Sequence, residues 1–187
     1  MDTTQVKNLI NILGKMKDLR RRGWVNRHIK NPESDADHSF SVALLTMLLA
    51  PKEIDLCKCL QMALVHDLPE VFCGDFVPNE IAPEEKQRLE TEAMRQLVQQ
   101  LNVPKMADLF AEFEAGQTPE ARFVKAIDRV DNVLTAEYYR TTQGIDLVAE
   151  FIQSALPRVM RLDEKTQKSL LRILQDLSVA KSDKDIF

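Results

Sequence analysis

The chain contains little glycine and proline, with 5 and 8 residues among 187. Domains built from many short strands need both residues at their turns, so their scarcity favours long helices. Cysteine is also scarce: three are present, and Cys57 and Cys59 lie two positions apart, which places them on different sides of a helix. The sequence therefore predicts neither a disulfide framework nor a thiolate zinc site.

Long apolar runs are missing too. No stretch approaches the roughly 20 apolar residues that a helix needs to span a membrane. The polar start at residues 1–4 does not have the pattern of a signal peptide. These absences predict a cytoplasmic protein with no membrane partner.

An excess of positive charge is absent as well. The formal net charge is −4, which argues against a nucleic-acid polymer as partner and leaves open a small anionic ligand held by local Arg or Lys residues. Hydrophobic residues make up 44% and charged residues 29% of the chain, as in ordinary globular proteins. The length is that of one domain, which we place at residues 1–180, followed by a charged C-terminal tail at residues 181–187.

Apolar residues recur with helical spacing along most of the chain, and no segment alternates convincingly as a strand does. Ser34 with Asp37 three positions later is close to a capping box, and Pro83 marks another helix start. The pattern predicts helices at about residues 4–20, 34–50, 53–66, 83–101, 105–115, 118–134, 145–155 and 164–178. We therefore predict an all-α, single-domain fold of about eight to ten helices.

The most informative stretch runs from Leu60 to Glu70. Its first part is an uninterrupted apolar helix, which ends by placing His66 and Asp67 side by side against the core. A metal cation would satisfy this buried pair, although a hydrogen-bonded structural pair is an equally ordinary interpretation. Glu70 returns to the same face one turn later, while Pro69 should kink or end the helix.

Two further side chains of suitable chemistry adjoin predicted core faces. His38 lies in the first turn of its helix, in line with an apolar stripe, and Asp128 adjoins the stripe of a later helix. The ordinary interpretations are a structural histidine and a carboxylate paired with Lys125. The functional interpretation is that both face the same centre as His66. The remaining histidine, His28, is expected to be exposed in a basic segment around the only Trp, which we predict to be a solvated loop.

In chain order these residues match H…HD…D, the pattern of HD-domain metal-dependent phosphohydrolases. The chain resembles most closely the branch of 5′-deoxynucleotidases, which release phosphate from deoxyribonucleoside 5′-monophosphates. The resemblance implies a helical HD-domain bundle. It rests on four motifs between about residues 20 and 140: Gly23-Trp24; Asn31-Pro32-Glu33-Ser34 leading to Asp37-His38; His66-Asp67-Leu68-Pro69-Glu70 with Gly74-Asp75; and Lys125-Ala126-Ile127-Asp128.

The resemblance implies a metal centre. In the family pattern the matching residues His38, His66, Asp67 and Asp128 bind one divalent cation, and Glu70 is the catalytic carboxylate. Two imidazoles and two carboxylates suit Co²⁺, Mn²⁺, Fe²⁺, Ni²⁺ or Zn²⁺ better than Mg²⁺. Such a cation would activate a water for attack on the phosphate. Only three histidines are present, which favours one metal over the dinuclear sites of some relatives.

The resemblance also implies substrate contacts. Trp24 would lie near the sugar, and Asp75 would contact the nucleoside end. Bacterial members carry a phosphate-orienting Arg directly before the Trp, where this chain has Gly23, so Arg21 or Arg22 would take that part. A nucleotide is thus the expected small-molecule substrate, and a homodimer is the expected assembly.

Two other functions stay open. Another mononuclear hydrolase of this superfamily would act on nucleoside triphosphates or guanosine alarmones, with Arg20-Arg21-Arg22 supplying phosphate contacts. A non-catalytic, metal-stabilised helical nucleotide-binding module would need neither Glu70 nor Asp75. The presence of both carboxylates favours an enzyme.

Overall fold

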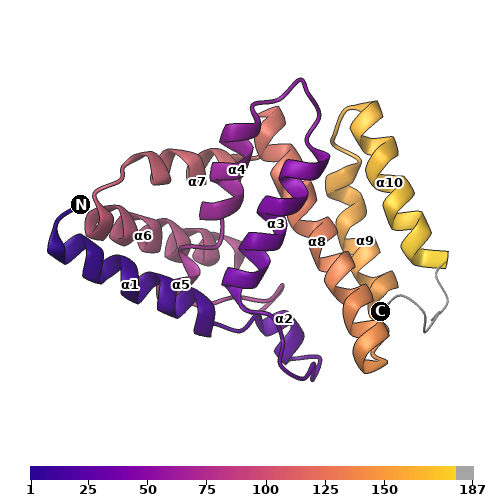
Figure 1. Ribbon diagram of the computed structural model, residues 1–187, viewed down its shortest axis with the longest axis horizontal. Helices are drawn as coiled ribbons and strands as arrows, with labels where there is room; N and C mark the ends of the chain where they lie inside the picture. The colour runs from indigo at the N-terminus through magenta and orange to yellow at the C-terminus, as the bar shows by residue number, and fades with distance from the viewer. Residues whose placement is uncertain (180–187) are drawn as a thin grey trace.

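A computed structural model describes residues 1–179, which form ten helices and no strand (Figure 1). One isolated antiparallel bridge joins Arg20 to Ser34. The helices are α1 (Thr3–Asp18), α2 (Arg22–Val25), α3 (Asp35–Leu49), α4 (Leu56–Val65), α5 (Glu70–Cys73), α6 (Pro83–Leu101), α7 (Lys105–Ala115), α8 (Pro119–Gln143), α9 (Val148–Val159) and α10 (Glu164–Val179). The all-α prediction is confirmed. The predicted charged tail at residues 181–187 lies outside the described residues.

Helix α8 is the centre of the fold. Thr118 caps its start by accepting a hydrogen bond from the backbone N–H of Ala121, and Gly144 ends it in the left-handed conformation at φ 71°. Most residues between Ala121 and Tyr139 are buried, because α3, α4, α7 and α9 pack around the helix (Figure 1). A polar side chain on the inner part of α8 is therefore held in the middle of the molecule.

Two groups of helices flank this centre. Helices α9 and α10 lie along one side of α8 and extend the main core, which also contains Trp24 and Val42. At the opposite end of the molecule, α1 and α6 enclose a smaller apolar cluster around Met94 and Leu97 (Figure 1). None of the described helices is long and apolar enough to cross a membrane.

Several segments differ from their predicted structure, and the largest difference is in α8, because the helix expected at 118–134 continues to Gln143. The helix expected at 53–66 covers Leu56–Val65, and a separate one-turn helix begins at Glu70. The predicted break at Pro69 is thus confirmed, since Pro69 has no N–H with which to continue the first helix. The basic segment expected to be a solvated loop forms the short helix α2 instead. His28 is exposed, as predicted, and Trp24 within this segment is buried. The helix expected at 145–155 lies at Val148–Val159.

Candidate functional site

His38 is held at the start of α3. Ser34 and Asp37 form the predicted capping box, in which each side chain accepts a hydrogen bond from the backbone N–H of the other residue. This cap fixes the first helical turn, and His38 lies fully buried on its inner face. Nδ1 of His38 lies 2.7 Å from Oδ2 of Asp131 on α8.

His66 and Asp67 lie where α4 ends. His66 is the C-cap residue of α4, and its Nδ1 donates a hydrogen bond to the carbonyl oxygen of Ala63 over 2.8 Å. A carbonyl oxygen can only accept, so the neutral ring of His66 keeps a lone pair on Nε2. Oδ2 of Asp67 lies 3.3 Å from that nitrogen.

Four side chains from three parts of the chain meet here. Nε2 of His38 lies 3.3 Å from Nε2 of His66, 3.6 Å from Oδ2 of Asp67 and 3.3 Å from Oδ1 of Asp128. Ligand atoms of His38, His66 and Asp67 all lie within 4.8 Å of one another. The structure thus brings together the four residues for which the resemblance implied a shared metal.

The arrangement fits a divalent cation. When both rings are neutral, both Nδ1 atoms donate to oxygen acceptors, so the two Nε2 atoms face each other with lone pairs at 3.3 Å. Lone pairs at this distance repel unless a proton or a metal ion lies between them. Two carboxylates beside these nitrogens complete a donor set of the kind that divalent transition metals bind.

Arg21 reaches this centre and Arg22 does not. The Arg21 side chain is 14% exposed, and its Nη1 donates to Oδ2 of Asp67 over 2.9 Å. Burial would raise the pKa of the Asp67 carboxyl, but His66 and Arg21 hold it well below its usual range. The Arg22 side chain pairs with Glu80 at 2.6 Å, outside the centre. Of the two candidates for orienting a phosphate, only Arg21 is in place.

Three buried carboxyl groups lie close together next to these residues. Oxygen atoms of Asp35, Glu70 and Asp75 lie within 4.8 Å of one another. Both oxygens of Asp35 and Oε2 of Glu70 have no hydrogen-bond partner among residues 1–179. Burial and the charge of Asp67 raise the pKa of Glu70 well above its usual value, and burial raises the pKa of Asp35 to about 7. A carboxyl group here can therefore carry a proton near neutral pH, as a general acid or base must.

A cavity of about 440 Å³ opens onto these groups. Its wall combines charged side chains with aromatic and aliphatic ones: Arg21, Asp67, Glu70, Asp75, Lys86, Asp128 and Arg129 with Trp24, Phe76, Val77, Ile81 and Phe151. Such a wall suits a ligand that joins an anionic group to an aromatic ring.

Several polar residues of the site had not been assigned to it by the sequence analysis, among them Asp35, Lys86, Arg129, Asp131 and Asn132. Asp35 precedes His38 by one turn and Asp131 follows Asp128 by one turn. Because residues three apart lie on neighbouring positions of a helix surface, this spacing could have pointed to both. No sequence signal singled out Lys86, which α6 brings to the cavity from outside the four motifs.

In the absence of metal, we expect the protein to lose thermal stability as the pH rises from about 6.5 to about 10. Asp35 has a pKa of about 7 in the folded protein against 3.8 in the free residue, mainly because it is buried. Burial and Arg21 oppose the charge of His38, but hydrogen bonds to Asp128 and Asp131 raise its pKa from 6.5 to about 10. Each group therefore stabilises the folded state below its free pKa, and this contribution is lost as the pH passes the folded pKa.

A divalent cation should oppose this trend, because its ligands must lose their protons to bind it. Melting temperatures measured across this pH range, with a chelator and with Mn²⁺, test the prediction. A chelated protein whose melting temperature rises between pH 6.5 and 10 would contradict it.

Comparison with known proteins finds clear relatives. Residues 13–170 match the HD domain family. The 5′-deoxynucleotidase hdd1 of Schizosaccharomyces pombe is 38% identical over 151 residues, which cover 76% of this chain and 76% of that protein. The 5′-deoxynucleotidase HDDC2 of Mus musculus is 36% identical over 139 residues, which cover 72% of this chain and 70% of that protein.

A solved structure shares the fold closely. The crystal structure of a protein from Pyrococcus horikoshii OT3 superposes with a TM-score of 0.79 at 30% sequence identity, over 92% of this chain and 99% of that one. The fold and the named relatives agree with the resemblance inferred from the four motifs.

Proposed function

The chain belongs to the HD domain family, and from this we propose that it is a metal-dependent phosphohydrolase that releases phosphate from deoxyribonucleoside 5′-monophosphates. One observation carries the proposal: the imidazoles of His38 and His66 meet two carboxylates, and these carboxylates line a cavity together with Arg21 and Glu70. The relatives named 5′-deoxynucleotidase support the substrate class. In this proposal residues 1–180 form the single catalytic domain.

Four residues hold the metal in this proposal: His38, His66, Asp67 and Asp128. Because imidazole nitrogens contribute half of the set, Co²⁺, Mn²⁺, Fe²⁺, Ni²⁺ or Zn²⁺ suits it better than Mg²⁺. Such a cation, when bound, supplies a Lewis acid that lowers the pKa of water and polarises a phosphoryl oxygen.

Glu70 moves the proton of the reaction. Its side chain lines the cavity, and no described residue makes a hydrogen bond to its buried Oε2. Its pKa is raised well above the usual range, first by burial, which favours the protonated form that a proton-donating group needs.

Trp24 and Asp75 contact the nucleoside. The ring of Trp24 packs on Phe151 at a centroid distance of 4.5 Å, and its Nε1–H donates to Oε1 of Glu33 over 2.8 Å. Trp24 lines the cavity but is only 1% exposed, so a small part of this fixed ring is open for a contact with the sugar. Asp75 lines the same cavity, and its Oδ2 accepts the backbone N–H of Arg22 over 2.6 Å.

Arg21 orients the phosphate, and we expect Arg21→Lys to lower kcat/KM about 10- to 100-fold, the range that corresponds to losing one hydrogen bond to a charged group. Lysine keeps the positive charge beside Asp67 but cannot offer the two-pronged donor geometry of a guanidinium. The matched control is Arg22→Lys, because that side chain pairs with Glu80 outside the cavity. Steady-state kinetics on a deoxyribonucleoside 5′-monophosphate compare the two variants. Equal losses in both would exclude Arg21 as the specific phosphate ligand.

We also propose that the enzyme is a cytoplasmic homodimer that associates through the outer face of α3. Phe40, Leu44, Met47 and Leu48 are exposed and recur at helical spacing, which makes one apolar stripe. A second copy of the chain would cover this stripe in a symmetric pair, the commonest assembly of soluble proteins. Light scattering on the purified protein tests the assembly.

The function is tested by measuring phosphate release from a panel of nucleotides. The panel contains deoxyribo- and ribonucleoside monophosphates, nucleoside triphosphates, guanosine alarmones and cyclic nucleotides, each with a chelator or with one divalent metal. We expect metal-dependent release from deoxyribonucleoside 5′-monophosphates. Release mainly from triphosphates or alarmones would replace the substrate class, and nucleotide binding without release under every metal would make the protein a binding module.

A further inference from the structure

His38 has acidic side chains on both sides of its ring. On the Nε2 side, the nearest oxygens of Asp67 and Asp128 lie 3.6 and 3.3 Å away. On the Nδ1 side, Oδ2 of Asp131 lies 2.7 Å away. His38 is fully buried and Asp131 is 3% exposed, so this contact is shielded from water. In such surroundings a hydrogen bond between charged or polar groups is strengthened.

The position of protons on this ring decides whether it can bind a metal. A neutral imidazole carries one proton, and its hydrogen-bond partners determine which nitrogen holds it. With a carboxylate at 2.7 Å, Nδ1 keeps its proton and Nε2 presents a lone pair toward His66. Without Asp131, the carboxylates of Asp67 and Asp128 would draw the proton to Nε2 and block that position.

We propose that Asp131 is a positioning residue that keeps the proton of His38 on Nδ1, so that Nε2 is free to bind the divalent cation. This inference rests on the proposed metal site and assigns a role to a residue outside the four ligands.

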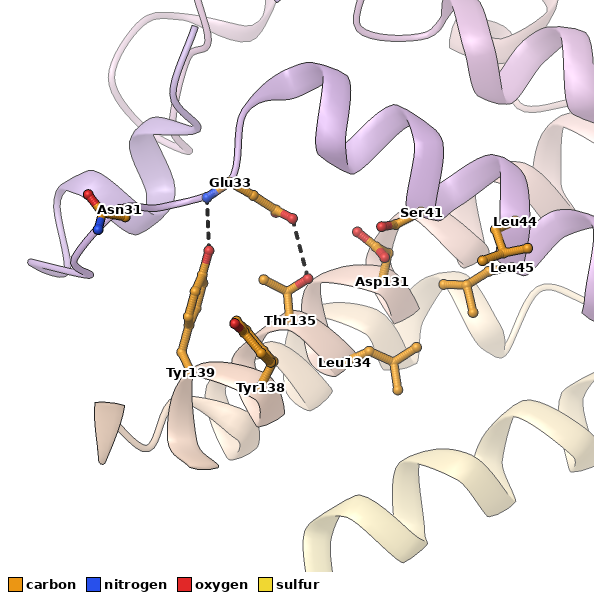
Figure 2. A pocket seen from close by; sticks show the side chains of 10 residues that line it. All are labelled: Asn31, Glu33, Ser41, Leu44, Leu45, Asp131, Leu134, Thr135, Tyr138 and Tyr139. Atoms are coloured by element: carbon orange, nitrogen blue, oxygen red, sulfur yellow. Dashed lines mark hydrogen bonds between the residues drawn. The ribbon is translucent and has the colours of Figure 1, made fainter. Parts of the chain in front are cut away.

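A second hollow of about 440 Å³ lies behind this pair and shares no wall residue with the cavity described above (Figure 2). Figure 2 shows Asp131 beside Ser41, between α8 and α3. Glu33 lines the same hollow, but its carboxylate accepts the Nε1–H of Trp24 and its backbone N–H donates to the hydroxyl of Tyr139 over 2.9 Å. An oxygen of Glu33 lies within 4.8 Å of ligand atoms of His38 and Asp131, but this carboxylate accepts the Nε1–H of Trp24 and lies 3.6 Å from Nε of Arg21. Glu33→Gln is therefore the control for a nearby carboxylate that does not hold the His38 proton.

Three variants test the inference through metal binding. Asp131→Leu removes the acceptor at similar volume, Asp131→Asn keeps an acceptor oxygen without the charge, and Glu33→Gln alters the neighbouring carboxylate. We measure the Zn²⁺ dissociation constant by competition with a chromophoric chelator. Asp131→Leu should weaken binding about 10- to 100-fold, the usual effect of losing the outer partner of a metal-binding histidine. Asp131→Asn should restore part of the loss, and Glu33→Gln should bind as wild type does.

A spectroscopic signature separates this role from simple support of the fold. The chain has only three histidines, so ¹H–¹⁵N spectra of the imidazoles in Zn²⁺-loaded protein can be assigned by substitution. Wild type and Glu33→Gln should show a slowly exchanging Nδ1–H proton on His38. Asp131→Leu should lack it, because no acceptor protects that proton.

Thermal unfolding and Zn²⁺ affinity distinguish a positioning role of Asp131 from simple support of the fold. If Asp131 only supported the fold, its variants would lower the melting temperatures of the chelated and the Zn²⁺-loaded protein equally. We expect instead that the increase in melting temperature caused by Zn²⁺ is smaller in the Asp131 variants than in the wild type. Unchanged Zn²⁺ affinity in Asp131→Leu would overturn the inference. If Asp131→Leu does not fold, unchanged Zn²⁺ affinity in Asp131→Asn would overturn it instead. Failure of the wild-type protein to bind Zn²⁺ or any other divalent metal would instead overturn the proposed metal site.

Discussion

Replacing Glu70 with Gln is expected to lower turnover about 10²- to 10⁴-fold while the divalent metal stays bound, because the variant keeps the shape of the side chain and loses the group that exchanges a proton. Glu70 clusters with Asp35 and Asp75 and is not among the four side chains that meet at Nε2 of His38. The measurement is steady-state kinetics on a deoxyribonucleoside 5′-monophosphate, with metal analysis of the same samples.

Two comparisons make the Glu70 result specific. Glu84→Gln changes an exposed carboxylate in the first turn of α6 and should leave turnover unaltered. Asp75→Asn changes the neighbouring carboxylate of the buried cluster and tests whether proton transfer belongs to that residue. Near-normal turnover in Glu70→Gln would remove Glu70 from the mechanism. Loss of metal in the same variant would make Glu70 a ligand.

Replacing Asp67 with Asn is expected to abolish measurable activity and to weaken metal binding by more than the ~10- to 100-fold effect of losing an outer partner of a ligand. The reason is that Asp67 lies between the proposed metal ligand His66 and the proposed phosphate ligand Arg21. Its Oδ2 lies 3.3 Å from Nε2 of His66, and the same oxygen accepts the guanidinium of Arg21 over 2.9 Å. Asparagine keeps an acceptor oxygen for Arg21 but not the negative charge that balances a cation.

The Asp67 prediction is checked by thermal unfolding with and without metal. Because the ligands come from α3, the end of α4 and α8, a bound metal links separate elements of the fold. At a metal concentration about 100 times the wild-type dissociation constant, binding should stabilise the wild type by about 2.7 kcal/mol and the variant by much less. Asp108→Asn on the exposed side of α7 is the control. Wild-type metal affinity in Asp67→Asn would show that the site is assigned wrongly.

Helix positions could be predicted from the sequence wherever nearby residues determine them. Ser34, Pro83 and Thr118 were predicted to start helices, and α3, α6 and α8 begin at or next to these residues. A cap acts through hydrogen bonds to backbone groups two or three residues away, so the whole interaction is contained in a short stretch of sequence. The same holds for Gly116, which ends α7 at a positive φ of 59°.

The ligand residues could be proposed because residue types and their order along the chain are properties of the sequence. That His38, His66, Asp67 and Asp128 lie together came from resemblance to a family, and periodicity showed only that they adjoin apolar faces. Their distances depend on how α3, α4 and α8 pack, which involves apolar contacts between segments far apart in the chain.

The sequence by itself determined the helical class, most helix ends and the chemistry available for a metal site, because propensity, capping and apolar spacing operate within a few residues. Only the tertiary structure distinguished Arg21 from Arg22. The two adjacent arginines have the same chemistry and the same sequence surroundings, and the packing of α2 decides which side chain is buried. It likewise placed Asp128 and Asp131, one turn apart on α8, at opposite nitrogens of His38. Burial and the pKa of a charged group depend on all groups around it, and most of these groups come from other helices.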